Sequence, residues 1–171
     1  MAGINQLGKG MMVVGSLTFL GVLTLWFGDI EQDRHYPNRN PKSIEQAGMT
    51  TVTLRQNRQG HYTFTGRING QPVDFLVDTG ATDVVIPQNV AVRLGLQPGR
   101  PQRANTAAGT ITVYQTVIPT LEIAGLRFDN VSGVVNPGME GGAALLGMSV
   151  IRHLELEQTG RTLILREKNN G

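Results

Sequence analysis

The sequence predicts a small all-β domain with one or two short helices, preceded by an apolar N-terminal segment. Glycine is abundant, with 22 residues in a chain of 171, whereas aromatic residues make up only 5%. From Thr51 onward, short runs of apolar and β-branched residues alternate with polar ones. Glycine-containing turn signals separate these runs at close intervals. This spacing is typical of strands that form a closed barrel or a sandwich.

The composition argues against several classes of function. The formal net charge is only +2, and no run of Lys and Arg marks a nucleic-acid surface. The chain has no cysteine, which removes thiol nucleophiles, thiolate metal sites and disulfides. His35, His61 and His153 are scattered without the spacing of metal ligands. We therefore expect no metal, no organic cofactor and no nucleic-acid partner.

Residues 1–28 predict an N-terminal tail and a transmembrane anchor. The nineteen residues 10–28 carry no charge. As a helix rising ~1.5 Å per residue, they would cover most of a ~30 Å hydrocarbon core. A cleaved signal peptide is the alternative, but this run is long for one and no small-x-small cleavage site follows it. Positive charges lie on both sides of the run, so they do not decide its orientation.

Residues 29–50 predict a flexible linker, because they are polar and contain Pro37 and Pro41. The folded domain is predicted at residues 51–168. Its first strands are TVTLRQ and HYTFTGRI, with a hairpin turn at residues 57–60. The Asn-Gly pair at residues 69–70 then predicts a tight hairpin turn into PVDFLV.

The second half of the domain continues this pattern. Pro87 predicts the start of a short helix, QNVAVRL, which Gly95 ends. Strands follow over TITVYQTVI and TLEI, and a turn at residues 124–125 leads into LRFDNVSGVV. The segment ALLGMSVIRHL combines an apolar run with a short helical pattern, and residues 154–167 predict two final strands.

The segment FLVDTGATDVVI carries the candidate chemistry. Asp78 directly follows an apolar strand and precedes Thr79 and Gly80, and glycine permits an abrupt turn and the close approach of a second backbone. A carboxylate at this position would be held rigidly between two apolar runs. Taken alone, the tripeptide fits equally well an aspartate that caps a turn, which is a common role.

The wider context resembles the retropepsin-like aspartic proteases. FLVDTGATDVVI is similar to the active-site signature of that family, and LLGMS is similar to its second landmark, two apolar residues followed by Gly147. RANTAAGTITVY, which lies between them, resembles the flap hairpin. Together with GHYTFTGRINGQPVDFLVDTGAT and RLGL at residues 93–96, the likeness covers about residues 50–166. These segments resemble the bacterial members that carry an N-terminal membrane segment.

The resemblance implies the retropepsin-like acid protease fold and an aspartic endopeptidase. Its chemistry needs two close carboxylates that share one proton. The chain has one Asp-Thr-Gly, so a homodimer would supply Asp78 twice, as base toward water and as acid toward the scissile carbonyl. Asp74 lies ~13 Å away along a strand and cannot be the partner. Asp129, beside an asparagine, is predicted to be a solvated turn residue.

The resemblance also assigns supporting residues. Thr79 would donate a hydrogen bond across the dimer axis, and Gly80 would face the substrate backbone. Substrate would contact the residues after the motif, the flap tip and the second landmark, namely Ala81, Thr82, Asp83, Ala107, Ala108, Gly109, Leu146 and Gly147. The small residues at the flap tip fit an ordinary hairpin turn equally well.

Two alternatives to an enzyme remain open. One is a non-catalytic peptide-binding domain of the same fold, although the Asp-Thr-Gly is intact. The other is a structural membrane-tethered β domain in which Asp78 caps a turn. If the chain is a protease, the expected substrate is an extended peptide from another membrane or envelope protein, or the chain's own linker. By family likeness, the domain would face the periplasm from a bacterial inner membrane.

Overall fold

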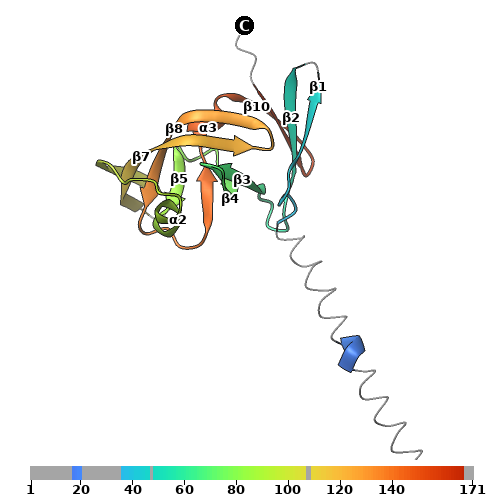
Figure 1. The fold of residues 1–171 in the computed structure, drawn as a ribbon, viewed down its shortest axis with the longest axis horizontal. Helices are drawn as coiled ribbons and strands as arrows, with labels where there is room; N and C mark the ends of the chain where they lie inside the picture. The colour runs from blue at the N-terminus through green and yellow to red at the C-terminus, as the bar shows by residue number, and fades with distance from the viewer. Residues whose placement is uncertain (1–16, 21–35, 47, 107–108, 168–171) are drawn as a thin grey trace, which may run out of the picture. The chain divides into compact units, whose positions relative to one another are not determined.

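The computed structural model describes residues 17–20, 36–46, 48–106 and 109–167. The chain divides into two units, Met1–His35 and Tyr36–Gly171, and the strands described below belong to the second (Figure 1). In the first unit, residues 17–20 are helical. Most of the predicted anchor, residues 10–28, lies outside the described residues. Among the residues that are described, no helix combines the length and hydropathy needed to cross a bilayer.

A four-stranded antiparallel sheet joins the two ends of the second unit. Its strand order is β1-β2-β11-β10. Strand β2, near the start of the unit, pairs with β11, which is the last strand. The strands are β1 (Lys42–Gln46), β2 (Met49–Arg55), β10 (Leu154–Thr159) and β11 (Thr162–Glu167).

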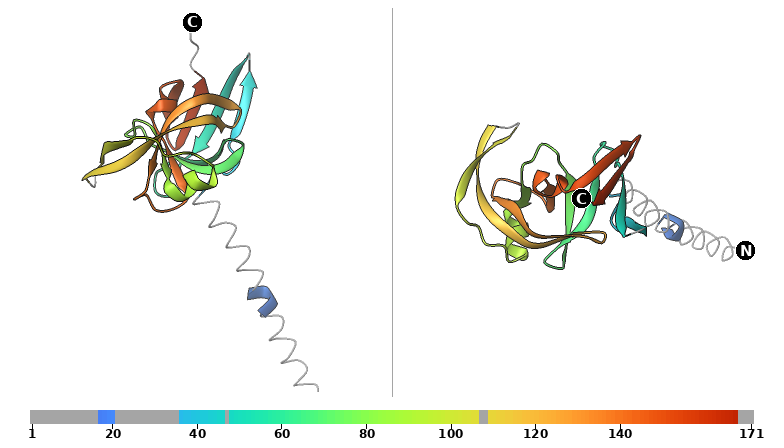
Figure 2. Two further views of the ribbon diagram at one scale, coloured as in Figure 1. Left: turned by 60° about the vertical axis from the view of Figure 1, so that its left-hand side comes forward. Right: turned by 90° about the horizontal axis from the view of Figure 1, so that it is seen from above.

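A seven-stranded sheet forms the body of the unit, in the order β3-β4-β9-β5-β8-β7-β6. An additional β3–β7 pairing closes this sheet into a ring of strands, while β6 stays outside the ring as an edge strand on β7. The β6–β7 hairpin extends away from the ring (Figure 2). The strands are β3 (Thr63–Ile68), β4 (Gln71–Val77), β5 (Val84–Pro87), β6 (Pro101–Thr106), β7 (Gly109–Ile123), β8 (Leu126–Asn136) and β9 (Ala143–Leu146).

Two short helices complete the second unit, α2 (Gln88–Arg93) and α3 (Met148–Ile151). Helix α2 follows Pro87, as predicted, and its residues Val90 and Ala91 are buried. Gly95, with φ of 69°, directly follows the helix C-cap, where a left-handed residue commonly ends a helix. The prediction of an all-β fold with few short helices is therefore confirmed.

Alternation along β3 and β4 determines which side chains fill the ring. Phe64 and Phe75 face each other across the β3–β4 pair, are fully buried and stack with ring centroids 5.3 Å apart. Asp74, the neighbour of Phe75, points to the other face and accepts the Thr65 hydroxyl at 2.6 Å. Asn69 and Gly70 both have positive φ, 50° and 76°, as the predicted two-residue turn requires.

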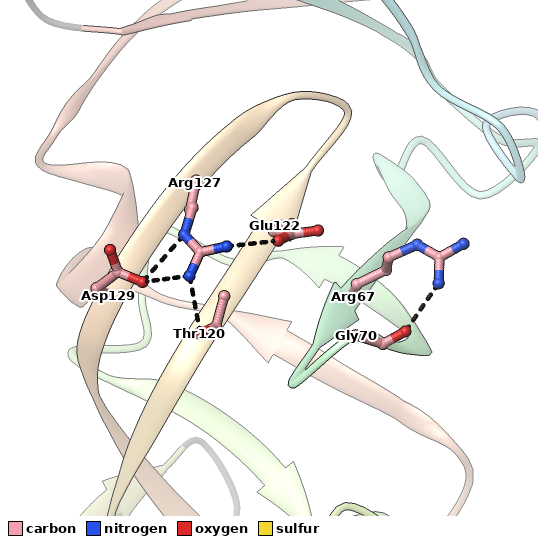
Figure 3. Close-up of polar contacts among 6 residues, drawn as sticks. All are labelled: Arg67, Gly70, Thr120, Glu122, Arg127 and Asp129. Atoms are coloured by element: carbon pink, nitrogen blue, oxygen red, sulfur yellow. Dashed lines mark hydrogen bonds and ion pairs between the residues drawn. The ribbon is translucent and has the colours of Figure 1, made fainter.

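Arg127 crosses the outer face of the β7–β8 hairpin (Figure 3). Its guanidinium lies 3.1 Å from Glu122 and 3.2 Å from Asp129, and it also donates to the Thr120 hydroxyl. Asp129 is therefore a strand residue in an exposed ion-pair network; its predicted solvent exposure is confirmed, and the predicted turn is wrong. An Asp-Asn pair is typical of a turn, but β8 continues through Asn130, which has a φ of 54°. Such exposed pairs contribute at most about 1 kcal/mol each.

The turn at residues 57–60 is present, but it does not connect a hairpin. The Asn57 side-chain oxygen accepts the N–H groups of Gln59 and His61, at 3.0 Å each. Strand β2, before the turn, pairs with β1 and β11, whereas β3, after it, pairs with β4 and β7. The predicted hairpin is wrong because the buried aliphatic face of β2 packs beside that of β11, a partner from the far end of the chain.

Part of the predicted linker, residues 29–50, belongs to the fold. Strand β1 has five exposed residues and so shows no apolar alternation in the sequence. Upstream of it, Asn38 is only 5% exposed. Its Nδ2 donates to the carbonyls of Arg55 and Thr63, at 2.9 and 2.7 Å, and its Oδ1 accepts the Arg55 N–H at 2.7 Å. Asn38 therefore ties the entering chain to the end of β2 and the start of β3.

We predict that Asn38→Ala lowers the free energy of unfolding by about 2–3 kcal/mol, because it leaves buried backbone groups without partners. Urea unfolding followed by circular dichroism measures this loss. Asn89→Ala is the matched control, since it removes an exposed hydrogen bond to the Gly141 carbonyl and should cost less than about 1 kcal/mol. Equal losses in the two variants would contradict the anchoring role of Asn38.

Candidate active site

Asp78 lies where two parallel strands end side by side. Val77, the last residue of β4, is the register partner of Leu146, the last residue of β9. The carboxyl ends of parallel strands lie at one edge of a sheet, so Asp78 and Gly147 meet there. The Asp78 N–H donates to the Leu146 carbonyl at 3.0 Å. The pairing of β4 with β9 therefore fixes the backbone of Asp78.

The Asp-Thr-Gly tripeptide forms a tight turn at this edge. The Asp78 Oδ1 accepts the Gly80 N–H at 2.9 Å, and the Asp78 carbonyl accepts the Ala81 N–H at 3.3 Å. Asp78 is half-buried, whereas Thr79 and Gly80 are exposed. The carboxylate thus caps its own turn through one oxygen. This cap orients the side chain beside open surface, where the second oxygen has no hydrogen-bond partner among the described residues.

Gly147 allows the two loops to touch. A Cβ at this position would lie 2.8 Å from the Ala81 carbonyl oxygen and closer still to the carbonyl group of Asp83. The following residue, Met148, donates its N–H to the same Ala81 carbonyl at 2.8 Å. Glycine is therefore required here by close packing of backbone against backbone.

The predicted substrate-contacting residues differ in their solvent exposure. Thr82 is exposed, and Ala81 and Asp83 are half-buried. Leu146 is fully buried, and Gly147 is buried as well. Within one chain, Leu146 and Gly147 are therefore buried against the loop that contains Asp78, and they do not line an open surface.

The β6–β7 hairpin contains the segment predicted to be the flap. It is held across its strands by paired backbones and by a Thr110 hydroxyl that donates to the Asn105 side-chain oxygen at 2.9 Å. Gly109, with φ of 114°, begins β7 and is exposed. Ala107 and Ala108, the rest of the predicted flap tip, lie outside the described residues.

Ser149 is a site residue that the sequence analysis did not identify. It is only 6% exposed, and its N–H donates to the Thr82 carbonyl at 2.9 Å. Its hydroxyl accepts the Val84 N–H at 3.1 Å and donates to the Ser132 carbonyl at 2.8 Å. Ser149 thereby connects the active-site loop with β5 and β8. The available signal was a hydroxyl two residues after Gly147 in an otherwise apolar segment.

The histidines do not gather near this site. His61 and His153 are exposed, and His35 lies outside the described residues. In the part of the chain that the structure describes, no group of three or more His, Asp or Glu side chains is arranged to hold a metal ion.

A family model agrees with this geometry. The model described as "gag-polyprotein putative aspartyl protease" matches residues 64–153, more than half of the chain. This span begins in β3, extends past α3, and contains both Asp78 and Gly147. The chain belongs to the retropepsin-like aspartic protease family.

Two curated relatives are similar to this retropepsin-like chain. An uncharacterized protein in the cobV 5' region of a Sinorhizobium species is 26% identical over 125 residues, covering 71% of this chain and 54% of that protein. Uncharacterized protein RP867 of Rickettsia prowazekii (strain Madrid E) is 24% identical over 116 residues, covering 67% of this chain and 50% of that protein. The retropepsin-like chain thus spans about half the length of the curated relatives it matches.

A solved structure shares the fold. The crystal structure of a retropepsin-like aspartic protease from Rickettsia conorii aligns with a TM-score of 0.58 at 23% identity. The alignment covers 75% of this chain and 94% of that chain. The retropepsin-like fold predicted from the sequence is therefore confirmed.

We predict that Gly147→Ala destabilises this retropepsin-like domain by about 3 kcal/mol, because the added methyl group overlaps backbone atoms of the active-site loop. Gly142→Ala is the matched control, since nothing lies within 4 Å of a Cβ there. The control should stay within about 0.5 kcal/mol of the parent. Thermal unfolding followed by circular dichroism compares the two, and an unchanged Gly147 variant would contradict the close packing of these loops.

Proposed function

We propose that this chain is an aspartic endopeptidase that works as a homodimer, with Asp78 of each copy forming the catalytic pair. The observation that carries the proposal is the intact Asp-Thr-Gly, its backbone fixed by Leu146 and its carboxylate beside open surface. This chemistry needs two adjacent carboxylates. Asp74 lies ~13 Å away along β4 and accepts the Thr65 hydroxyl. A second copy related by two-fold symmetry supplies the missing partner.

In the proposed mechanism, the two Asp78 carboxyl groups share one proton, because two negative charges so close together resist joint ionisation. The ionised Asp78 takes a proton from water, whose oxygen attacks the scissile carbonyl carbon. The protonated Asp78 donates its proton to the carbonyl oxygen, which gives a tetrahedral intermediate. Proton transfer to the amide nitrogen then allows the C–N bond to break. We expect an acidic optimum, since the pair must keep one proton.

The proposed substrate is an extended peptide. Thr79 would donate a hydrogen bond across the dimer axis beneath the pair, and Gly80 would face the peptide backbone. Thr82 and its neighbours Ala81 and Asp83 would lie along the floor of the cleft. The β6–β7 hairpin would close over the bound strand and exclude water.

We also propose that residues 10–28 form a single-pass anchor in a bacterial inner membrane, with the protease domain in the periplasm. Two tethered copies share one surface, which raises their effective concentration and favours the dimer. The chain's own linker is a candidate substrate, together with other membrane or envelope proteins. Cleavage in the linker would fall before Asn38, because residues 42–46 are paired with β2 and Asn38 is buried.

We predict that Asp78→Asn in the full chain, held in mild detergent, lowers peptide hydrolysis by at least about 10³-fold. An amide cannot serve as the base, but its oxygen can still accept the Gly80 N–H, so the fold should persist. Asp74→Asn is the matched control on the same strand, since it also keeps an acceptor for Thr65 and should retain activity. Mass spectrometry of a digested peptide library, from about pH 4 to about pH 7, measures the cleavage.

Each outcome separates the candidate functions. Cleavage by the parent and by Asp74→Asn, but not by Asp78→Asn, supports the endopeptidase. Peptide binding without cleavage by any of the three favours the non-catalytic binding domain. Equal cleavage by the parent and Asp78→Asn would show that Asp78 is not the catalyst.

A further inference from the structure

The carboxylate of Asp83 is held by a side chain from a neighbouring strand. Asp83 directly precedes β5, which pairs in parallel with β8, so that Val84 lies opposite Gly133. One position earlier on β8, the Ser132 hydroxyl donates to Asp83 Oδ1 at 2.8 Å. Ser132 thus sets the direction in which the Asp83 carboxylate points.

The backbone on both sides of Asp83 is held by Ser149. The Ser149 N–H bonds the carbonyl of Thr82, and its hydroxyl bonds the N–H of Val84. The same hydroxyl donates to the carbonyl of Ser132 at 2.8 Å. Asp83 is therefore fixed at three points, two on the backbone through Ser149 and one on the carboxylate through Ser132. We call Ser132 and Ser149 the serine clamp.

The clamped carboxylate lines an open surface cavity of about 640 Å³. Its lining includes Asp83 and Ser132 together with Arg100, Gln102 and Gln115. The Gln115 side chain donates to that of Gln102 at 2.9 Å across β6 and β7, so this part of the lining belongs to the hairpin predicted to be the flap. The second oxygen of Asp83 has no hydrogen-bond partner among the described residues. An ionised carboxylate can only accept, so this oxygen favours a donor.

We propose that the serine clamp positions Asp83 to bind a lysine or arginine side chain of the substrate in this cavity. The inference rests on the peptide binding of the proposed function and does not require turnover. A carboxylate already fixed in one rotamer loses less freedom when it binds a cation. Asp83 and Arg100 are the charged residues among the described lining of the cavity. The positive charge of Arg100 repels a cationic ligand, whereas the carboxylate of Asp83 attracts it. Ser132 and Ser149 act through Asp83 and do not contact the reacting atoms.

The test compares paired peptide libraries in which one position at a time is fixed as lysine or as methionine, an uncharged side chain of similar length. Cleavage is measured with the full chain, and binding with the full chain carrying Asp78→Asn. The lysine-to-methionine ratio should exceed 1 at one position. Ser132→Ala should lower this ratio about fivefold to tenfold, since a charge-assisted contact loses its orientation. Ser132→Thr keeps the hydroxyl and should restore most of the ratio.

Two further variants exclude a purely structural role. Asp83→Asn should lower the ratio, and adding Ser132→Ala to it should produce no further loss, because both changes act on one contact. Arg100→Gln should raise the ratio, since the opposing charge is removed. A serine clamp that only stabilised the loop would change stability without changing the ratio.

The outcomes separate this inference from the proposed function. Lysine selectivity in binding that depends on Ser132, without cleavage, would support the inference and overturn the endopeptidase. Cleavage with a ratio that Ser132→Ala and Asp83→Asn leave unchanged would overturn the inference and keep the endopeptidase. Absence of any lysine preference, both in cleavage by the parent and in binding by the Asp78→Asn chain, would also overturn the inference.

Discussion

The parallel pairing of β4 with β9 is the constraint on which the site depends. These strands are far apart in the sequence, yet their ends are register partners, so the loop after each strand leaves at the same edge. The hydrogen bond from the Asp78 N–H to the Leu146 carbonyl continues the ladder by one residue beyond β4. The loop of Asp78 then lies against Gly147, where no side chain fits. Without this pairing, Asp78 would be an aspartate in an ordinary surface turn.

The scaffold around this pairing divides the site into a fixed part and a projecting part. The ring of strands, closed by the β3–β7 pairing, carries Asp78 and its supports. Such closure removes free edges, and the buried Phe64–Phe75 stack fills the interior. The β6–β7 hairpin lies outside the ring at the edge of the sheet. Sites built on paired strands hold their residues more precisely than sites built on loops.

Local signals in the sequence were sufficient for the elements with a buried face or a distinctive turn. The Asn69-Gly70 turn, the helix after Pro87 and the alternation through Phe75 all appear where they were predicted. Strand β1 was missed because its side chains are exposed and its stability comes from backbone pairing with β2. The pairing of β2 with β11 was missed because the residues of a strand do not specify which distant strand will pair with it.

The residues of the candidate site likewise divide into those with a local sequence signal and those whose role depends on distant partners. Asp78 and Gly147 belong to short motifs, and a motif can be recognised without knowing the fold. Ser132 and Ser149 belong to no motif, and their role depends on hydrogen bonds between β8, α3 and the active-site loop. Leu146 is predicted to contact substrate from its place in the second landmark, and within one chain its side chain is fully buried. Only the three-dimensional arrangement separates a residue that supports the loop from one that lies on its surface.

We propose that two copies of Asp78 form one catalytic pair, and mixing of parent and variant subunits can test this directly. A fixed amount of the parent chain is combined with increasing amounts of Asp78→Asn, and native mass spectrometry verifies that mixed dimers form. If both carboxylates are needed and subunits pair at random, a threefold excess of the variant should leave about one quarter of the parent activity. Unchanged activity in the presence of verified mixed dimers would show that one Asp78 suffices, and would contradict this account.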